Sequence, residues 1–243
     1  MNVYISFLIG FVFLNAQTAS LPKNAPISVL SSIKTVDIEH TSEIDTFDPT
    51  WVDSLSLSLP CYGIPVPKRT MRLPNAPRNY RNGTHRGLDF FANWGTPVRS
   101  VADGIVVRSD LHYEEVPADF RENLLKATTK VGHTPSDIFN SVLLGKSVFL
   151  DHGFDLIPGF RTISIYAHLS HIEKEIVPGA IVKRGELLGK SGNTGMREST
   201  IGSKAGSHLH WELILQKEGK EIYLGKGMSN PELYDMLSRI FTQ

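Results

Sequence analysis

The sequence predicts an all-β domain, mainly antiparallel, with one helical insertion and a C-terminal helix. Short β-type runs recur from about residue 85, turns containing glycine separate them, and residues 162–167 alternate between two faces with a period of two. The chain has 243 residues, enough for one domain with an extension. Its 20 glycines and 14 prolines suit many short strands better than a helix bundle.

An uncharged apolar run occupies residues 3–14, and small residues follow it up to residue 20. The run is shorter than the roughly 20 residues that a helix needs to span a bilayer. Residues 1–20 are therefore predicted to be a signal peptide or a short membrane anchor. We expect export, to the periplasm or to the extracellular side of the cell envelope.

The remaining chain divides into an extension and a domain. Residues 21–58 are polar without a sustained period, which predicts an extension or linker with a short strand near 27–35; the domain then spans 59–243. The strands expected in it are 86–91, 97–101, 104–109, 147–151, 161–167, 180–182, 186–190 and 208–216. Segment 112–146 carries two helix-like stretches and predicts the insertion, and Asn230-Pro231 predicts the start of the last helix.

Charge and cysteine content exclude several classes of protein. The 25 basic and 25 acidic residues cancel, which argues against a nucleic-acid partner. The single cysteine, Cys61, excludes an intramolecular disulfide framework and a cysteine-based zinc cluster. Nine histidines remain as candidate metal ligands.

Two histidine motifs have the spacing of metal ligands on strands. Side chains alternate between the faces of a strand, so His85 and Asp89 share one face and His208 and His210 share another. Two such strands side by side could supply histidine, aspartate and histidine to one metal ion. Three protein ligands and a water form the usual catalytic zinc site. Each motif alone is common by chance, and the two together favour a metal site.

A third motif places His168 at the end of the clearest predicted strand. A zinc hydrolase needs a group that takes and returns protons, and the His-Glu-x-x-His helix that would bring a glutamate is absent. A histidine can do this work, so His168 and one of His208 and His210 are the candidates. Glu212 shares a face with His210 and is either a carboxylate that supports it or a solvated strand residue.

These motifs, in this order, resemble the lysostaphin-like (LytM-domain) zinc endopeptidases, which cut peptidoglycan peptides. The resemblance covers about residues 60–235. The residues that carry it are His85-Arg-Gly-Leu-Asp89, Gly95-Thr-Pro-Val98, Ala102-Asp-Gly-Ile-Val106, Asp151-His-Gly153, Tyr166-Ala-His-Leu-Ser170, Val177–Gly195 and Ser207-His-Leu-His-Trp-Glu-Leu213.

The resemblance implies a LytM-type fold with an open groove and one zinc ion per chain. It implies His85, Asp89 and His210 as zinc ligands, and His168 and His208 as the catalytic histidines beside the metal-bound water. The expected activity is hydrolysis of peptide cross-links or stem peptides of bacterial peptidoglycan. We expect a monomer with no nucleic-acid partner, while a regulatory partner in the envelope stays open.

Two features depart from the family pattern. About 35 residues, 112–146, replace a short turn, and segment 196–206 lengthens the loop before His208. Both fall where groove walls are expected. The sequence therefore does not indicate which bond is cut, or whether the insertion or the extension inhibits the groove. A catalytically silent wall-binding or amidase-activator module is the main alternative. A biotinyl-type module fits less well, because this sequence has no carrier lysine in a hairpin turn. A D-Ala–D-Ala peptidase fits less well, because those enzymes have a longer His-to-Asp spacing than the one found here.

The remaining candidates have simpler interpretations. His152 is predicted to lie in a turn and His171 at the surface, neither as a metal ligand. Trp94 and Trp211 are predicted to be core or groove-rim aromatics, and Arg86 a solvated charge.

Overall fold

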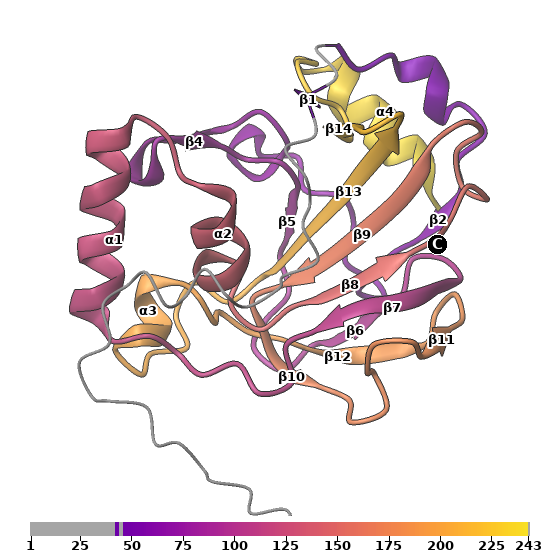
Figure 1. The fold of residues 1–243 in the computed structure, drawn as a ribbon. Coiled ribbons are helices and arrows are strands. Elements are labelled where there is room, and N and C mark those ends of the chain that lie inside the picture. The colour runs from indigo at the N-terminus through magenta and orange to yellow at the C-terminus, as the bar shows by residue number, and fades with distance from the viewer. Residues whose placement is uncertain (1–41, 44–45, 243) are drawn as a thin grey trace, which may run out of the picture. The chain divides into compact units, whose positions relative to one another are not determined.

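The structure is a computed structural model that describes residues 42–43 and 46–242 (Figure 1). The predicted signal segment 1–20 and the short strand expected near 27–35 lie outside the described residues. Within the described ranges, no helix is both long and apolar enough to cross a membrane.

The main sheet has eight strands and is antiparallel except at one edge, which confirms the predicted fold class. Its order is β1-β14-β13-β9-β8-β7-β11, and β5 also pairs with β13. The bounds are β1 Ser42–Glu43, β5 Leu88–Phe90, β7 Gly104–Ser109, β8 Val148–Asp151, β9 Arg161–Ala167, β11 Ile181–Val182, β13 Leu209–Lys217 and β14 Lys220–Tyr223. Among the described strands of this sheet, β1 and β14 form the one parallel pair.

A smaller antiparallel sheet joins β10 (Leu169–Ile172), β12 (Leu187–Ser191) and β6 (Pro97–Arg99). The core contains fully buried Tyr166 and Trp211 from the main sheet and Leu188 from the smaller one. Because inward-facing residues alternate along each strand, the two sheets share one apolar core. Trp211 is thus a core aromatic, whereas Trp94 is 39% exposed beside Lys204.

The insertion lies between β7 and β8 and is helical, as predicted. It consists of α1 (Ala118–Val131), the short helix α2 (Ser136–Ile138) and a π-helical turn over Phe139–Leu143. Figure 1 shows α1, α2 and α3 (Arg197–Thr200) together on one side of the main sheet. Phe139, Leu143 and Leu144 pack in a separate cluster against apolar side chains of β8, β9 and β13. The insertion is therefore anchored to the sheet.

The other described elements are short. They are the 3₁₀ turns Pro49–Val52, Thr70–Arg72 and Asn79–Arg81, the strand pairs β2 (Leu57–Ser58) with β15 (Phe241–Thr242) and β3 (Pro77–Arg78) with β4 (Gly83–Thr84), and the C-terminal helix α4 (Glu232–Ile240). The helix α4 begins one residue after Pro231, in agreement with the prediction.

The described end of the extension belongs to the domain, although the sequence suggested a boundary at residue 59. Phe47, Val52, Leu55 and Leu57 are buried in the main core, and Leu57 pairs with Phe241 of β15. The apolar residues here alternate only over a few positions, between a 3₁₀ turn and a two-residue strand. Such short elements give too little periodicity to be predicted.

Replacing Leu57 by alanine tests this boundary. We expect Leu57→Ala to lower the free energy of unfolding by about 2–5 kcal/mol, because it removes a fully buried side chain from the core. Urea unfolding followed by tryptophan fluorescence measures the change. Ser54→Ala, at an exposed position of the same segment, is the control and should change stability by less than about 0.5 kcal/mol. Equal stability of the two variants would place the boundary after residue 58.

Candidate metal centre

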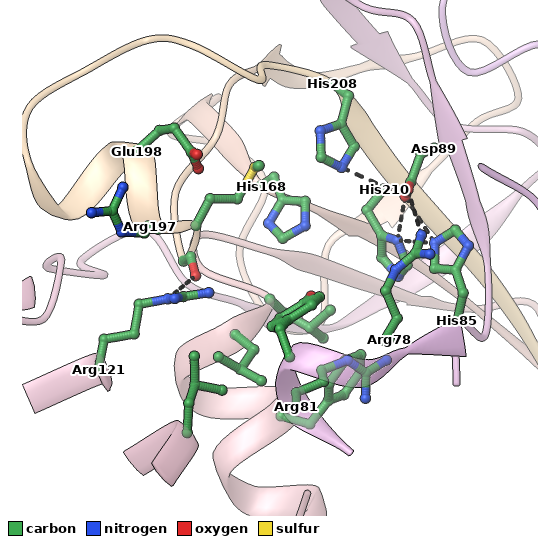
Figure 2. Close-up of a pocket in the computed structure, with 17 residues that line it drawn as sticks. Arg78, Arg81, His85, Asp89, Arg121, His168, Arg197, Glu198, His208 and His210 are labelled. Carbon is green, nitrogen blue, oxygen red and sulfur yellow. Dashed lines mark hydrogen bonds and ion pairs between the residues drawn. The ribbon is translucent and has the colours of Figure 1, made fainter. Parts of the chain in front are cut away.

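Strand register brings the predicted metal ligands together. On β13, His210 lies opposite Asp89 of β5 on one side and Ala167 of β9 on the other. His85 precedes β5, and its backbone N–H donates to Ala76 O. His168 follows Ala167 directly, so all five predicted site residues converge at one end of these strands (Figure 2).

Three donor atoms meet within hydrogen-bond distance. Asp89 Oδ1 lies 2.9 Å from His85 Nε2 and 2.9 Å from His210 Nδ1, and the two nitrogens are 3.1 Å apart. One ligand atom from each residue lies within 4.8 Å of the others. All three side chains are buried, with at most 8% of each residue exposed.

A hydrogen bond from the outer nitrogen of each imidazole determines which nitrogen faces the three-donor centre. His85 Nδ1 donates to the Leu73 carbonyl at 2.8 Å, and His210 Nε2 donates to Glu212 Oε1 at 2.8 Å. In the neutral rings, His85 Nε2 and His210 Nδ1 therefore present lone pairs to each other and to a carboxylate oxygen. Three acceptors this close need a proton or a metal cation among them. Two imidazole nitrogens and one carboxylate fit zinc.

The charges around Asp89 keep its carboxylate ionised. Burial raises the pKa of Asp89, but the charge of His85 and hydrogen bonds from His208 and His210 lower it well below the usual range. Arg78 Nη2 donates to Asp89 Oδ2 at 2.9 Å, which leaves Oδ1 directed at the histidines. Sequence reasoning did not identify Arg78, because nothing in its local sequence indicates a partner eleven residues away.

Glu212 supports His210, which resolves the two readings left open by the sequence. Its side chain is fully buried, and its second oxygen lies 3.0 Å from Arg86 Nη2. Burial raises the pKa of Glu212, but Arg86 and His210 lower it to about 2. Burial lowers the pKa of His210, yet hydrogen bonds to Asp89 and Glu212 raise it overall. Arg86 is thus an ion-pair partner of Glu212 and only partly solvated, contrary to the expectation of a solvated charge.

His168 and His208 lie beside the three donors and are oriented in the same way. His168 Nδ1 donates to Thr194 O at 2.8 Å, and His208 Nδ1 donates to Gly206 O at 2.7 Å. Their ring centroids are 4.9 Å apart, and His208 Nε2 lies 3.5 Å from Asp89 Oδ1. Burial, together with the charges of His208 and His210, lowers the pKa of His168 well below its usual value.

The backbone of His168 adopts a left-handed conformation with φ of 60°, which is uncommon for residues other than glycine. Its N–H donates to Leu144 O of the insertion at 2.9 Å. Such a conformation persists only where the surrounding structure holds it, and it occurs often at functional sites. The insertion therefore helps to place His168.

The site opens into a cavity of about 460 Å³, the size of a small-ligand site. The five site residues line it together with Arg121 and Leu125 of α1, Phe139 and Leu143 of the π-helical turn, and Met196, Arg197 and Glu198 at α3. The groove expected from sequence is thus walled on one side by the insertion and by the lengthened loop.

The remaining candidates lie away from the donors. His152 is buried, with its Nδ1 facing Asp103 O at 2.6 Å and its Nε2 facing Ser164 Oγ at 2.7 Å, so it supports the core rather than a turn at the surface. His171 is exposed beside Glu173, as expected.

The structure thus combines an antiparallel β domain with a His–Asp–His donor set that could hold one metal ion. Residues 127–223 match Peptidase family M23, which confirms the resemblance to the LytM-type family. The matched range includes His168, His208 and His210, while His85 and Asp89 precede it.

Individual relatives support the same assignment. The chain is 29% identical over 140 residues to the peptidoglycan DD-endopeptidase ShyA of Vibrio cholerae. The matched region covers 58% of this chain and 22% of ShyA. It is 30% identical over 128 residues to an uncharacterized metalloprotease of Haemophilus influenzae, with 53% of this chain and 18% of the relative covered. The chain thus spans less than a quarter of the length of these two relatives.

Among solved structures, the catalytic domain of the antimicrobial peptidase lysostaphin from Staphylococcus simulans is similar, with 20% sequence identity and a TM-score of 0.36. The similarity covers 70% of this chain and 87% of that domain.

Removing the charge of Glu212 tests how His210 is held. We expect Glu212→Gln to weaken zinc binding by about 10- to 100-fold, because the neutral amide is a weaker acceptor than the carboxylate for the hydrogen bond from His210 Nε2 that orients the ring. Competition with a chelator of known affinity measures the change. Glu173→Gln is the matched control, since Glu173 also lies two residues from a histidine but pairs with it at the surface, at 3.7 Å. Equal zinc affinity of the two variants would show that Glu212 does not support a metal ligand.

Proposed function

We propose that this protein is a zinc-dependent metalloendopeptidase that hydrolyses peptide cross-links or stem peptides of bacterial peptidoglycan. The observation that carries the proposal is the convergence of His85 Nε2, Asp89 Oδ1 and His210 Nδ1 beside two further oriented histidines. The M23-type domain supports a peptidase, and the similarity to a peptidoglycan DD-endopeptidase supports the substrate.

His85, Asp89 and His210 would hold one zinc ion per chain. When bound there, zinc supplies a Lewis acid that polarises the scissile carbonyl and lowers the pKa of a water. The hydrogen bonds from His85 to Leu73 O and from His210 to Glu212 place the proton of each neutral ring on its outer nitrogen, so that the two coordinating nitrogens face one point.

His168 and His208 would supply the proton chemistry. Each donates its Nδ1 proton to a backbone carbonyl, so each presents Nε2 toward the cavity. One Nε2 would accept a proton from the attacking water as a general base, and the other ring, protonated at Nε2, would donate to the oxyanion that develops at the amide. The two rings lie 4.9 Å apart beside the same donors, so we assign the two roles to the pair and not to either ring alone.

The silent-module alternative is not favoured. A domain that had lost catalysis would not need to retain all five residues. It would also not need the separate acceptor that orients each of the four imidazoles.

We also propose that the protein is exported to the periplasm or the extracellular cell envelope and acts as a monomer. The export proposal rests on the apolar run at residues 3–14. Peptidoglycan lies outside the cytoplasmic membrane, which agrees with the proposed substrate.

Zinc analysis combined with a digestion assay tests the proposed activity. The purified protein is expected to hold about one zinc ion and to release soluble fragments from purified peptidoglycan sacculi, with the new ends identified by mass spectrometry. His210→Ala should lose both properties. His168→Ala and His208→Ala should keep zinc and lose about 10²- to 10⁴-fold in rate, since they remove only the proton-transfer group.

His171→Ala is the matched control, because His171 is an exposed histidine on β10 outside the cavity, and it should digest sacculi like the parent protein. Removal of zinc by a chelator should abolish digestion, and added zinc should restore it. Zinc bound without digestion of sacculi, or full digestion by His168→Ala and His208→Ala, would contradict the proposal.

A further inference from the structure

The cavity beside the metal donors carries more arginine than the metal centre uses. Four arginines and two carboxylates line it. Arg78 is occupied by Asp89, at 2.9 Å. Among the residues that the structure describes, Arg81, Arg121 and Arg197 form no ion pair with an aspartate or a glutamate.

Arg121 is the most informative of these side chains. It projects from α1 of the insertion, is only 9% exposed, and donates from Nε to Gly195 O at 3.0 Å. That bond fixes the guanidinium plane, and within the described part of the chain neither Nη atom has a hydrogen-bond partner. Glu115 contacts the same loop, but its carboxylate accepts from the Tyr113 hydroxyl and from Gly195 N. A buried guanidinium without a counter-ion is costly, and an anionic ligand would offset that cost.

The two ends of the cavity differ in chemistry. Figure 2 shows Arg121 and Arg197 on one side together with Glu198, the three metal donors on the other, and His168 between them. Glu198 forms no ion pair with an arginine among the described residues, so this end keeps two arginines and one carboxylate. The cavity lining also includes the apolar side chains of Leu125, Phe139, Leu143, Leu144 and Met196. A ligand that filled the cavity would therefore have an apolar portion in addition to the reacting amide and an anionic group.

We propose that Arg121 and Arg197 form a carboxylate-binding subsite, so that the enzyme selects peptides that carry a free carboxylate near the scissile amide. Arginine suits this role, because its planar fork donates two parallel hydrogen bonds to a carboxylate. Both residues lie in the two segments that depart from the family pattern, and α1 contacts α3. This inference rests on the proposed function and assigns its substrate selectivity to the insertion and the lengthened loop.

Binding of paired ligands tests the subsite without relying on turnover. The protein is the full chain, loaded with zinc and carrying His168→Ala to suppress cleavage. The probes are soluble fluorescent stem-peptide fragments with free carboxylates, and the same fragments after conversion of the carboxylates to amides. Fluorescence anisotropy should show that amidation weakens binding about tenfold or more, as expected for loss of a charge-assisted bidentate contact.

Arginine variants in this background locate the preference. Arg121→Gln and Arg197→Gln should each reduce the difference between free and amidated fragments to less than about threefold. Arg99→Gln is the matched control, since Arg99 also donates to a backbone carbonyl, Gly185 O, but lies outside the cavity, and it should keep the full difference. Arg197 is exposed, so its variant remains decisive if Arg121→Gln does not fold.

Equal binding of the two fragments by the parent would overturn the subsite. A preference kept in both arginine variants would also overturn it, because the carboxylate would then be bound elsewhere, for example by the zinc. Digestion of sacculi by the wild type is measured separately. Digestion without a carboxylate preference would refute the subsite alone, and a preference without digestion would refute the peptidase alone.

Discussion

The shared contact of His85 and His210 with Asp89 Oδ1 is the constraint on which the site depends. Two nitrogen lone pairs and a carboxylate oxygen lie about 3 Å apart inside a buried region, where like-charged or lone-pair contacts are strongly unfavourable unless a cation joins them. The β5–β13 register sets Asp89 opposite His210, and Leu73 O, Glu212 and Arg78 hold the three groups from behind. Much of the surrounding sheet thus serves to keep one set of acceptors together.

The insertion is joined to this site by two separate routes. The Phe139 ring lies 4.4 Å from the Arg86 guanidinium, which pairs with Glu212, and Glu212 in turn holds His210. The Leu144 carbonyl accepts from the backbone of His168. A segment that appears in the sequence as an interruption between two strands therefore contacts the supports of a candidate metal ligand and of a candidate catalytic histidine.

The sequence predicted those parts of the structure that follow from local periodicity. The strands at 104–109 and 161–167 have the expected bounds, and Asp89 and His210 lie opposite each other on neighbouring strands. His85 reaches the same centre from the segment just before β5, not from the strand itself. Local spacing could not reveal Arg78 and Arg86 as ion-pair partners, nor the carbonyls of Leu73, Thr194 and Gly206 as acceptors. These are contacts between distant segments, and backbone acceptors leave no signature in side-chain identity.

A crystal structure of the zinc-loaded protein, with anomalous data collected at the zinc edge, tests the central claim most directly. The account predicts one anomalous peak bound by His85 Nε2, Asp89 Oδ1 and His210 Nδ1, with His168 and His208 next to it but not coordinated. A peak coordinated by His168 or His208 in place of one of these ligands would contradict it. So would a peak reached through His85 Nδ1 or His210 Nε2, because the hydrogen bonds to Leu73 and Glu212 would then be broken.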